Sequence, residues 1–323
     1  MQRKYHHHSF WLIPSLVLLF SFPLAVEAAR CLYVSSYHPE YKWDQGIRRG
    51  VEAVLKDECE LSSFFMDTKR NKQAEFAKAK AEEAFAFIKS LKPDVVIAAD
   101  DNASRYLVAP YLRDTDIPVV FCGINTSAEP YGYPYSNATG MVEVTPHRPL
   151  LLALQGVLGD VKKGMYLSAE VISQKRMHRQ LAEQFRHEGI ALSAKFVNSQ
   201  AEWEEAWLSF DKEGFIFVGN PAGIADWDTA RANDFVAKHA DSLTFTAWNW
   251  LAPLAMITIA KEPEEQGEWA AQVALKIIRE GVSPGDIPVV INRRWRMFVN
   301  HDLLQRADFS IPLNMQHIAE RVE

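Results

Sequence analysis

The sequence predicts an α/β protein made of two Rossmann-like lobes with parallel sheets, joined by a hinge that the chain crosses several times. Short apolar runs rich in β-branched residues alternate with helical segments, as in sheets covered by helices on both faces. This alternation runs from residue 31 to about 145 and starts again near residue 164. The tail after residue 250 holds a strong helical pattern at 264–280 that neither run needs. We therefore expect the tail to return to the first lobe and then to recross, which makes a hinge between two lobes.

The first run contains five expected strands. Pro93 ends the helix before the third strand, because proline cannot continue a helix, and the apolar run Val95–Ile97 follows it. Asp44 is placed to cap the first helix. The expected strands cover residues 31–36, 61–66, 95–97, 119–125 and 137–144, and the expected helices cover 44–56, 73–90 and 103–112.

The second run repeats the pattern and the tail completes it. Its expected strands cover residues 164–168, 190–197, 215–218 and 243–246, and its expected helices cover 146–158, 171–188, 201–210 and 225–239. A strand at 287–291 and a helix at 298–305 follow the helix at 264–280. We therefore expect a first lobe of residues 30–145 plus about 250–291, and a second lobe of 146–249 plus about 298–323.

Residues 1–29 have the order of a secretory signal peptide. A basic pair precedes the apolar segment Phe10–Val26, and the small residues Ala28 and Ala29 follow it. A retained membrane anchor is the alternative, but two prolines interrupt the segment, which is short for a span of about 20 residues. Lipidation at Cys31 would need a small residue where Arg30 stands. Cleavage after Ala28 or Ala29 would give an exported, periplasmic protein.

Three cysteines occur in the chain, and their placement leaves one pairing open. Cys31 opens the first expected strand, and Cys59 lies just before the second. Both positions fall at the amino-terminal edge of adjacent parallel strands, so a disulfide between them is geometrically allowed. Two buried free thiols are the alternative reading. Cys122 ends the fourth strand with no local histidine or lysine to activate it, and we interpret it as a packing residue.

The strand ends supply the candidate ligand-binding residues. The third strand ends on Asp100, Asp101 and Asn102 directly before a helix, and open α/β sheets bind ligands at such carboxyl ends. Helix capping by one of the three is the simpler interpretation, although capping does not need three polar residues. The candidates are Ser36, Tyr37, Trp43, Asp67, Asp100, Asp101, Asn102, Gly123 and Asn125 in the first lobe, and Ser168, Asn220, Trp248 and Trp250 in the second.

These side chains favour a small ligand with an amine and an apolar or aromatic body, such as an amino acid. Aromatic rings give a flat apolar wall that also stacks on cations, and an aspartate can hold an amine. Helix N-termini can hold a carboxylate through backbone N–H groups. Core packing is the alternative role for tryptophans, of which the chain has nine.

Composition and motifs argue against several other classes of protein. The formal net charge is −6 and no basic stripe occurs, which argues against nucleic-acid binding. No spaced set of metal ligands, nucleophile elbow or phosphate-binding glycine loop is present. We therefore expect no cofactor, no metal and no catalytic residue. A cleft enzyme remains the less favoured alternative.

Several segments together resemble the substrate-binding proteins of ABC transporters, with the type I periplasmic binding protein fold. Their order and spacing carry the resemblance, which covers most of the chain after residue 30: Tyr33–Trp43, Met66–Arg70, Lys92–Asn102, Pro118–Asn125, and the tail Asp286-Ile-Pro with Asn300 and Ile311-Pro. The resemblance implies a cleft that closes on a solute, an ABC permease as partner, and a monomer or weak dimer. The His38-Pro-x-Tyr-x-Trp loop resembles the subset found beside sensor kinases, so a sensor-kinase ectodomain is the alternative partner.

Overall fold

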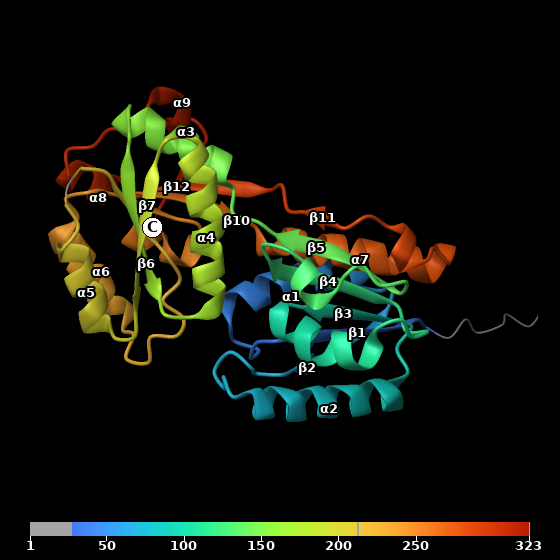
Figure 1. Ribbon diagram of the computed structural model, residues 1–323. Coiled ribbons are helices and arrows are strands. Elements are labelled where there is room, and N and C mark those ends of the chain that lie inside the picture. The colour runs from blue at the N-terminus through green and yellow to red at the C-terminus, as the bar shows by residue number, and fades with distance from the viewer. Residues whose placement is uncertain (1–27, 212, 323) are drawn as a thin grey trace, which may run out of the picture.

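The protein folds into two α/β lobes that lie side by side, as the computed structural model shows for residues 28–211 and 213–322 (Figure 1). Most of the predicted signal peptide lies outside the described residues. Within those residues, no helix is both long and apolar enough to cross a membrane. The prediction of two lobes with mostly parallel sheets is confirmed.

The first lobe contains a six-stranded sheet in the order β11-β5-β4-β3-β1-β2, in which every pair is parallel. Its elements are β1 (Arg30–Ser35), α1 (Lys42–Leu55), β2 (Glu60–Phe65), α2 (Ala74–Leu91), β3 (Val95–Ala99), η1 (Ala103–Leu112), β4 (Val119–Asn125), η2 (Glu129–Tyr131), β5 (Ala138–Glu143), α7 (Pro263–Glu280), η4 (Pro284–Asp286) and β11 (Val290–Ile291).

Helices cover both faces of this sheet because side chains alternate along its buried strands. Val95 and Ile97 of β3 pack with α1 and α7, whereas Val96 and Ala98 pack with α2 and η1. Helices α1 and α7 approach closely where they cross. A Cβ atom at Gly267 of α7 would lie 1.9 Å from the backbone oxygen of Ile47 in α1, so only glycine allows this crossing.

The second lobe contains a seven-stranded sheet in the order β13-β12-β10-β9-β8-β6-β7, in which only the β10–β12 pair is antiparallel. Its elements are α3 (His147–Leu158), β6 (Lys163–Ala169), α4 (Ile172–His187), β7 (Ala191–Val197), α5 (Gln200–Leu208), β8 (Phe215–Val218), α6 (Thr229–His239), β9 (Leu243–Thr246), η3 (Asn249–Leu254), β10 (Ile257–Lys261), β12 (Trp295–Val299), α8 (His301–Arg306), α9 (Leu313–Gln316) and β13 (Ala319–Arg321).

The tail crosses between the lobes later than the sequence predicts. Residues 250–261, expected in the first lobe, form η3 and β10 of the second, because β10 pairs with β9 and buries its side chains in the second core. The predicted helix at 298–305 is also displaced. Its first part is strand β12, whose inward side chains Met297 and Val299 alternate with outward ones.

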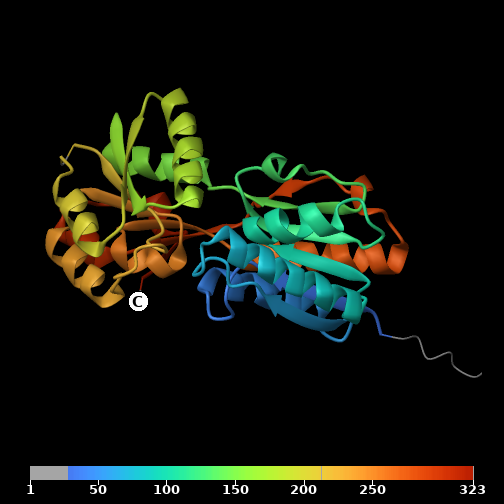
Figure 2. The ribbon, with the colours of Figure 1, turned by 60° about the horizontal axis from the view of Figure 1, so that its bottom comes forward.

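Three segments therefore connect the lobes: the chain between β5 and α3, between β10 and α7, and between β11 and β12 (Figure 2). The first and third are tied to each other. The Asn292 side chain accepts a hydrogen bond from the backbone N–H of Val144 at 2.6 Å. Arg294 forms ion pairs with Glu262 and Glu268, which connect the second and third segments. The hinge thus consists of three connecting segments held together by hydrogen bonds and ion pairs.

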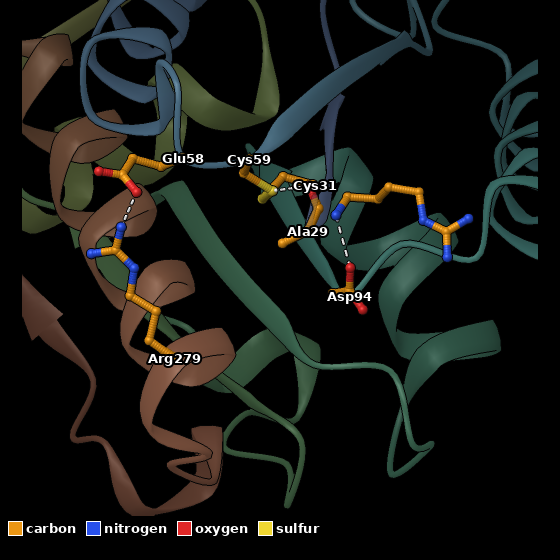
Figure 3. The surroundings of a disulfide bond; sticks show 7 residues. Ala29, Cys31, Glu58, Cys59, Asp94 and Arg279 are labelled. Atoms are coloured by element: carbon orange, nitrogen blue, oxygen red, sulfur yellow. Dashed lines mark hydrogen bonds and ion pairs between the residues drawn. A yellow bond between two sulfur atoms is a disulfide. The ribbon is translucent and has the colours of Figure 1, made fainter. Parts of the chain in front are cut away.

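Cys31 and Cys59 are joined by a disulfide at the amino-terminal edge of the first sheet (Figure 3). Cys31 lies in β1 and Cys59 just before β2, and the two Cα atoms are 5.9 Å apart. Close by, the backbone N–H of Arg30 donates to Asp94 at 2.7 Å. Cys122 is free and buried, and burial raises the pKa of its thiol, so it packs rather than reacts.

Candidate ligand-binding cleft

A cavity of about 710 Å³ lies between the two lobes at the carboxyl ends of their parallel strands. The first lobe lines it with the segments that follow β1, β2, β3, β4 and β5. The second lobe lines it with the segments that follow β6, β8 and β9 and with the start of α4. A volume of this size suits a small solute.

The cavity wall contains part of the predicted set. The predicted residues in the wall are Tyr37, Trp43, Asp101, Asn102, Asn125, Asn220 and Trp248. Those outside the wall are Ser36, Asp67, Asp100, Gly123, Ser168 and Trp250. Both groups come from the expected strand ends, so the difference between them lies in what each side chain contacts.

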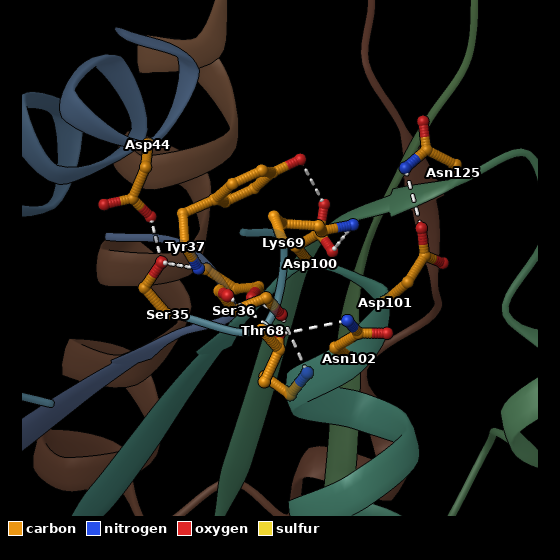
Figure 4. A network of polar contacts seen from close by, with 12 residues as sticks. Ser35, Ser36, Tyr37, Asp44, Thr68, Lys69, Asp100, Asp101, Asn102 and Asn125 are labelled. Carbon is orange, nitrogen blue, oxygen red and sulfur yellow. Dashed lines mark hydrogen bonds and ion pairs between the residues drawn. The ribbon is translucent and has the colours of Figure 1, made fainter. Parts of the chain in front are cut away.

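Asp100 and Asp101 are neighbours with separate partners (Figure 4). Asp100 accepts a hydrogen bond from the Tyr37 hydroxyl at 2.7 Å and pairs with the Lys69 ammonium at 2.7 Å. Asp101 accepts from the Asn125 amide at 2.7 Å and from the Tyr131 hydroxyl at 2.5 Å. Asp100 also has a φ of +75°, a left-handed conformation that is costly for a residue other than glycine. The turn after β3 is therefore held in place by its side-chain contacts.

Asp101 differs from Asp100 in having no ion-pair partner among the described residues. It is 7% exposed, and its hydrogen-bond donors Asn125 and Tyr131 are neutral. Burial and the neighbouring Asp100 carboxylate raise the pKa of Asp101 above its ordinary value. A cation in the cavity would reverse that effect, because it would favour the charged form of this carboxyl group.

Most of the predicted residues outside the wall have structural partners. Ser36 accepts from the backbone N–H of Ala103 at 2.8 Å and so satisfies the start of η1. None of Asp100–Asn102 provides that cap, contrary to the capping interpretation. The N–H of Gly123 donates to Gln266, Ser168 donates to Gln174, and Asp67 forms a bidentate pair with Arg70.

Aromatic side chains form a continuous wall on one side of the cavity. Tyr37 and Tyr41 stack with ring centroids 4.2 Å apart. Trp250 lies behind them, 6.4 Å from Tyr41 and 6.2 Å from Trp43. Trp248 completes the wall from the second lobe, and its ring contacts that of Trp250 at 6.4 Å. Because ring pairs at these distances attract one another, the wall keeps its shape without a ligand.

A buried ion pair joins the lobes beneath this wall. Lys261 ends β10 of the second lobe and bonds Glu143, which ends β5 of the first, and both side chains are at most 5% exposed. The Lys261 ammonium also lies 5.4 Å from the Trp43 ring centroid and 5.2 Å from that of Trp248. One cation thus holds a carboxylate and two indole rings drawn from both lobes.

Solved structures with a similar fold include binding proteins and transcriptional regulators. An ABC domain from Streptococcus pneumoniae in complex with L-Trp matches with a TM-score of 0.67 and 14% identity, over 91% of this chain and 100% of that one. A ligand-free, open substrate-binding protein with adhesive properties from Clostridium difficile matches with a TM-score of 0.68 and 16% identity, over 91% and 99%. An ABC transporter solute-binding protein from Agrobacterium vitis bound to α-D-tagatopyranose gives 0.58 and 14%, over 91% and 100%.

The chain has the type I periplasmic binding protein fold. The identities are low, so these structures establish the fold and not the ligand. No family model matches the sequence, and no curated protein matches it.

The type I fold brings into the cleft several residues that sequence reasoning missed. These residues are Tyr41, Thr68, Lys69, Arg105, Tyr131, Glu143, Glu170, Gln174 and Arg176. Arg105 and Arg176 lie near the beginnings of η1 and α4, the helices that directly follow two of the strand ends. Extending the strand-end rule by one or two helical turns would have found both. Tyr131 lies in η2, which follows β4, and Glu143 is the last residue of β5. Neither position has a cluster of polar residues in the sequence like the one at Asp100–Asn102.

Proposed function

We propose that the protein is an extracytoplasmic solute-binding protein that closes its cleft on a small amino-acid-like ligand for an ABC importer. The observation that carries this proposal is the Asp101 carboxylate, buried in the cavity wall without an ion-pair partner among the described residues. An ammonium group would supply that partner. The aromatic wall beside it would take the apolar or aromatic body of the same ligand.

The comparisons support the class of protein and leave two ligand types to separate. The Streptococcus pneumoniae structure holds L-Trp and the Agrobacterium vitis structure holds a sugar. Aromatic walls stack on both. A buried carboxyl group without an ion-pair partner favours an amine, which would supply that partner, whereas a sugar would offer it only neutral hydroxyl donors. We therefore place the amino acid first and the sugar as the competing result.

The proposal includes export, action as a monomer or weak dimer, and binding without turnover. Residues 1–29 have the order of a signal peptide, and the solved structures of this fold include an ABC transporter solute-binding protein. A sensor-kinase ectodomain is the alternative partner, and it would recognise the same ligand-closed form of the protein. The ABC permease is preferred as partner because the Streptococcus pneumoniae structure is an ABC domain and the Agrobacterium vitis structure is an ABC transporter solute-binding protein.

The test is binding of solutes to the mature protein, residues 30–323, followed by thermal unfolding and calorimetry. Amino acids, sugars, nucleosides and amines form the panel. A ligand at a hundred times its Kd should stabilise the protein by about 2.7 kcal/mol. Asp101→Asn should lose most of the affinity for an amine-bearing ligand. Trp43→Ala should weaken binding of a ligand with an apolar or aromatic body. Asp116→Asn, outside the cavity wall, is the matched control.

Three results would count against this proposal. Tight binding of a sugar with no effect of Asp101→Asn would replace the ligand class. Unchanged affinity in both Asp101→Asn and Trp43→Ala would move the site elsewhere. Consumption of the bound compound, measured by mass spectrometry after incubation, would make the protein an enzyme.

A further inference from the structure

Two arginines, one from each lobe, converge on the same tyrosine in the cavity wall. Arg105, near the start of η1 in the first lobe, has its guanidinium carbon 5.9 Å from the ring centroid of Tyr131. Arg176, near the start of α4 in the second lobe, donates to the Tyr131 hydroxyl at 3.1 Å. Figure 1 shows α4 on the side of the second lobe that faces the first. Both arginines line the cavity.

Neither arginine has a carboxylate partner among the described residues, in contrast to Lys69 and Arg70 in the same cavity wall. Lys69 pairs with Asp100 at 2.7 Å, and Arg70 pairs with Asp67 at 2.8 Å. Arg105 and Arg176 form no ion pair within residues 28–211 and 213–322. Arg105 is exposed and Arg176 is half-buried. A guanidinium presents a planar fork of donors that matches a carboxylate, so two unpaired forks in one cavity suit an anionic ligand group.

We propose that Arg105 and Arg176 together form a carboxylate-binding subsite that the ligand completes across the two lobes. This inference rests on the proposed solute-binding function and specifies the ligand further: it carries a free carboxylate close to its amine. Because one arginine comes from each lobe, the carboxylate would bridge the lobes and favour the closed cleft.

The position of Tyr131 sets the spacing between the two charged ends of the ligand. Its hydroxyl accepts from Arg176 at 3.1 Å and donates to Asp101 at 2.5 Å. The unpaired carboxylate and the unpaired guanidinium are thus separated by only two hydrogen bonds. An α-amino acid carries its ammonium and carboxylate on one carbon, which fits this short spacing. A compound with charged groups at opposite ends of a long chain does not fit it.

The first experiment tests the subsite without knowledge of the ligand. Thermal unfolding of the mature protein is measured in chloride, acetate and inorganic phosphate at equal ionic strength. The variants are Arg105→Gln/Arg176→Gln and the control Arg179→Gln, which removes an exposed arginine of α4 outside the cavity wall. Anions also stabilise proteins nonspecifically, so the readout is the difference between variants.

We expect acetate to raise the Tm of the wild type and of Arg179→Gln above their values in chloride, and to raise that of the double variant less. Equal shifts in all three proteins would show an adventitious ion effect only and would overturn the subsite. A variant-specific shift in phosphate but not in acetate would overturn the assignment to a carboxylate.

The second experiment uses matched compounds and calorimetry. L-Trp, L-Tyr, L-Phe and L-Leu are each compared with the corresponding amine that lacks the carboxylate. For the amino acid that binds, we expect its amine to bind on the order of 10- to 100-fold more weakly, as for a lost hydrogen-bonded charge. The double variant should lose a similar factor for the amino acid and little more for the amine.

The two experiments separate failure of this inference from failure of the proposed function. Equal binding of an amino acid and its amine would overturn the carboxylate subsite and leave the solute-binding function standing. No binding in the panel together with a variant-specific acetate shift would keep the subsite and overturn the amino-acid ligand. If no compound in the panel binds and acetate gives no variant-specific shift, both the subsite and the proposed function are overturned.

Discussion

The first strands of the two lobes carry the same polar arrangement with one chemical difference. In the first lobe, the hydroxyls of Tyr33 and Ser35 both donate to one oxygen of Asp44 in α1, with the Tyr33 bond at 2.6 Å. The Ser35 hydroxyl in turn accepts from the backbone N–H of Tyr37 at 3.0 Å. A buried carboxylate thus fixes the loop that brings Tyr37 to the cavity.

The second lobe repeats the arrangement with an amide as the acceptor. The hydroxyls of Tyr166 and Ser168 donate to the Gln174 side-chain oxygen at 2.7 and 2.9 Å. The same oxygen accepts from the backbone N–H of Asn220 at 3.1 Å and so fixes that segment of the cavity wall. Both lobes therefore fix a segment of the cavity wall through a Tyr-x-Ser strand and a helix side chain, but only the first lobe uses a carboxyl group as the acceptor.

We therefore expect the network of the first lobe to respond to pH and the equivalent network of the second lobe not to. Burial raises the pKa of Asp44 to about 6. The same lobe holds the buried Asp100, Asp101 and Glu143 at its strand ends. In the second lobe, Glu170 after β6 is the acidic residue of the cavity wall, and Asn220 and Trp248 after β8 and β9 are neutral. The comparison predicts effects of different size when each side is changed.

The largest effect is expected at the ion pair that joins the lobes. Lys261→Met would leave Glu143 buried without its cation and would remove the contacts with Trp43 and Trp248. Breaking a buried pair in this way costs about 3–5 kcal/mol in the free energy of unfolding. Urea unfolding at pH 8 measures it. Burial already raises the pKa of Glu143, so the loss should shrink at acidic pH, where this carboxyl group is neutral.

The exposed pair Arg296–Glu320 is the matched control for this prediction. Its side chains are 49% and 45% exposed, so Arg296→Met should cost no more than about 1 kcal/mol. Equal losses in Lys261→Met and Arg296→Met would show that the interlobe pair adds nothing to stability beyond an exposed one. The charged contact between the lobes would then have no larger effect on stability than a contact on the surface.

The next effect is the pH dependence that Asp44 gives to the first lobe. Its folded pKa of about 6 lies above its value in the unfolded chain, so the folded state retains a proton that the unfolded state has lost. The stabilisation is fully present below about pH 4 and is lost as the pH rises through 6. Asp44→Asn keeps an oxygen acceptor for Tyr33 and Ser35, and should remove about 3 kcal/mol of pH-dependent stability over this range.

The measurement is urea unfolding of the wild type and Asp44→Asn at several pH values between 4 and 8. The difference between the two curves isolates this carboxyl group from all others. Gln174→Asn, which shortens the neutral acceptor of the second lobe, should lower stability by the same amount at every pH. A pH-independent difference for Asp44→Asn would show that the two networks are equivalent despite their chemistry.

The sequence predicted the fold well because it depends on features that repeat. Alternating apolar runs and helical segments recur at each βα unit, and Pro93 marks a boundary. The boundary near residue 250 was wrong because β10 reads as an ordinary apolar run, and only its pairing with β9 assigns it to the second lobe. The helix predicted from residue 298 begins only at His301, because pairing with β10 keeps residues up to Val299 in the strand β12.

The candidate site was harder to predict because a strand end fixes a position but not what a side chain contacts. Asp100 and Asp101 are adjacent in sequence, yet only Asp101 lies in the cavity wall. Ser36 and Gly123 are at the expected edge, but their hydrogen bonds go to the protein itself. Contacts between lobes, such as that of Arg176 with Tyr131, join residues 45 positions apart and carry no local signal.

The smallest effect is expected at a neutral contact between the lobes. The Asn220 amide donates to the Tyr41 hydroxyl at 2.9 Å, and Tyr41→Phe removes this bond while keeping the ring stacked on Tyr37. A neutral hydrogen bond contributes about 1 kcal/mol, which corresponds to about a fivefold change in an equilibrium. Single-molecule energy transfer between dyes at exposed positions 78 and 179, on α2 and α4, would measure the fraction of open molecules. That fraction should rise in Tyr41→Phe relative to the wild type.

Tyr106→Phe is the control, since Tyr106 lines the cavity but its hydroxyl has no hydrogen-bond partner in the described part of the chain. An identical open fraction in Tyr41→Phe and Tyr106→Phe would mean that the charged contacts alone, Lys261 with Glu143 foremost, set the balance between the lobes.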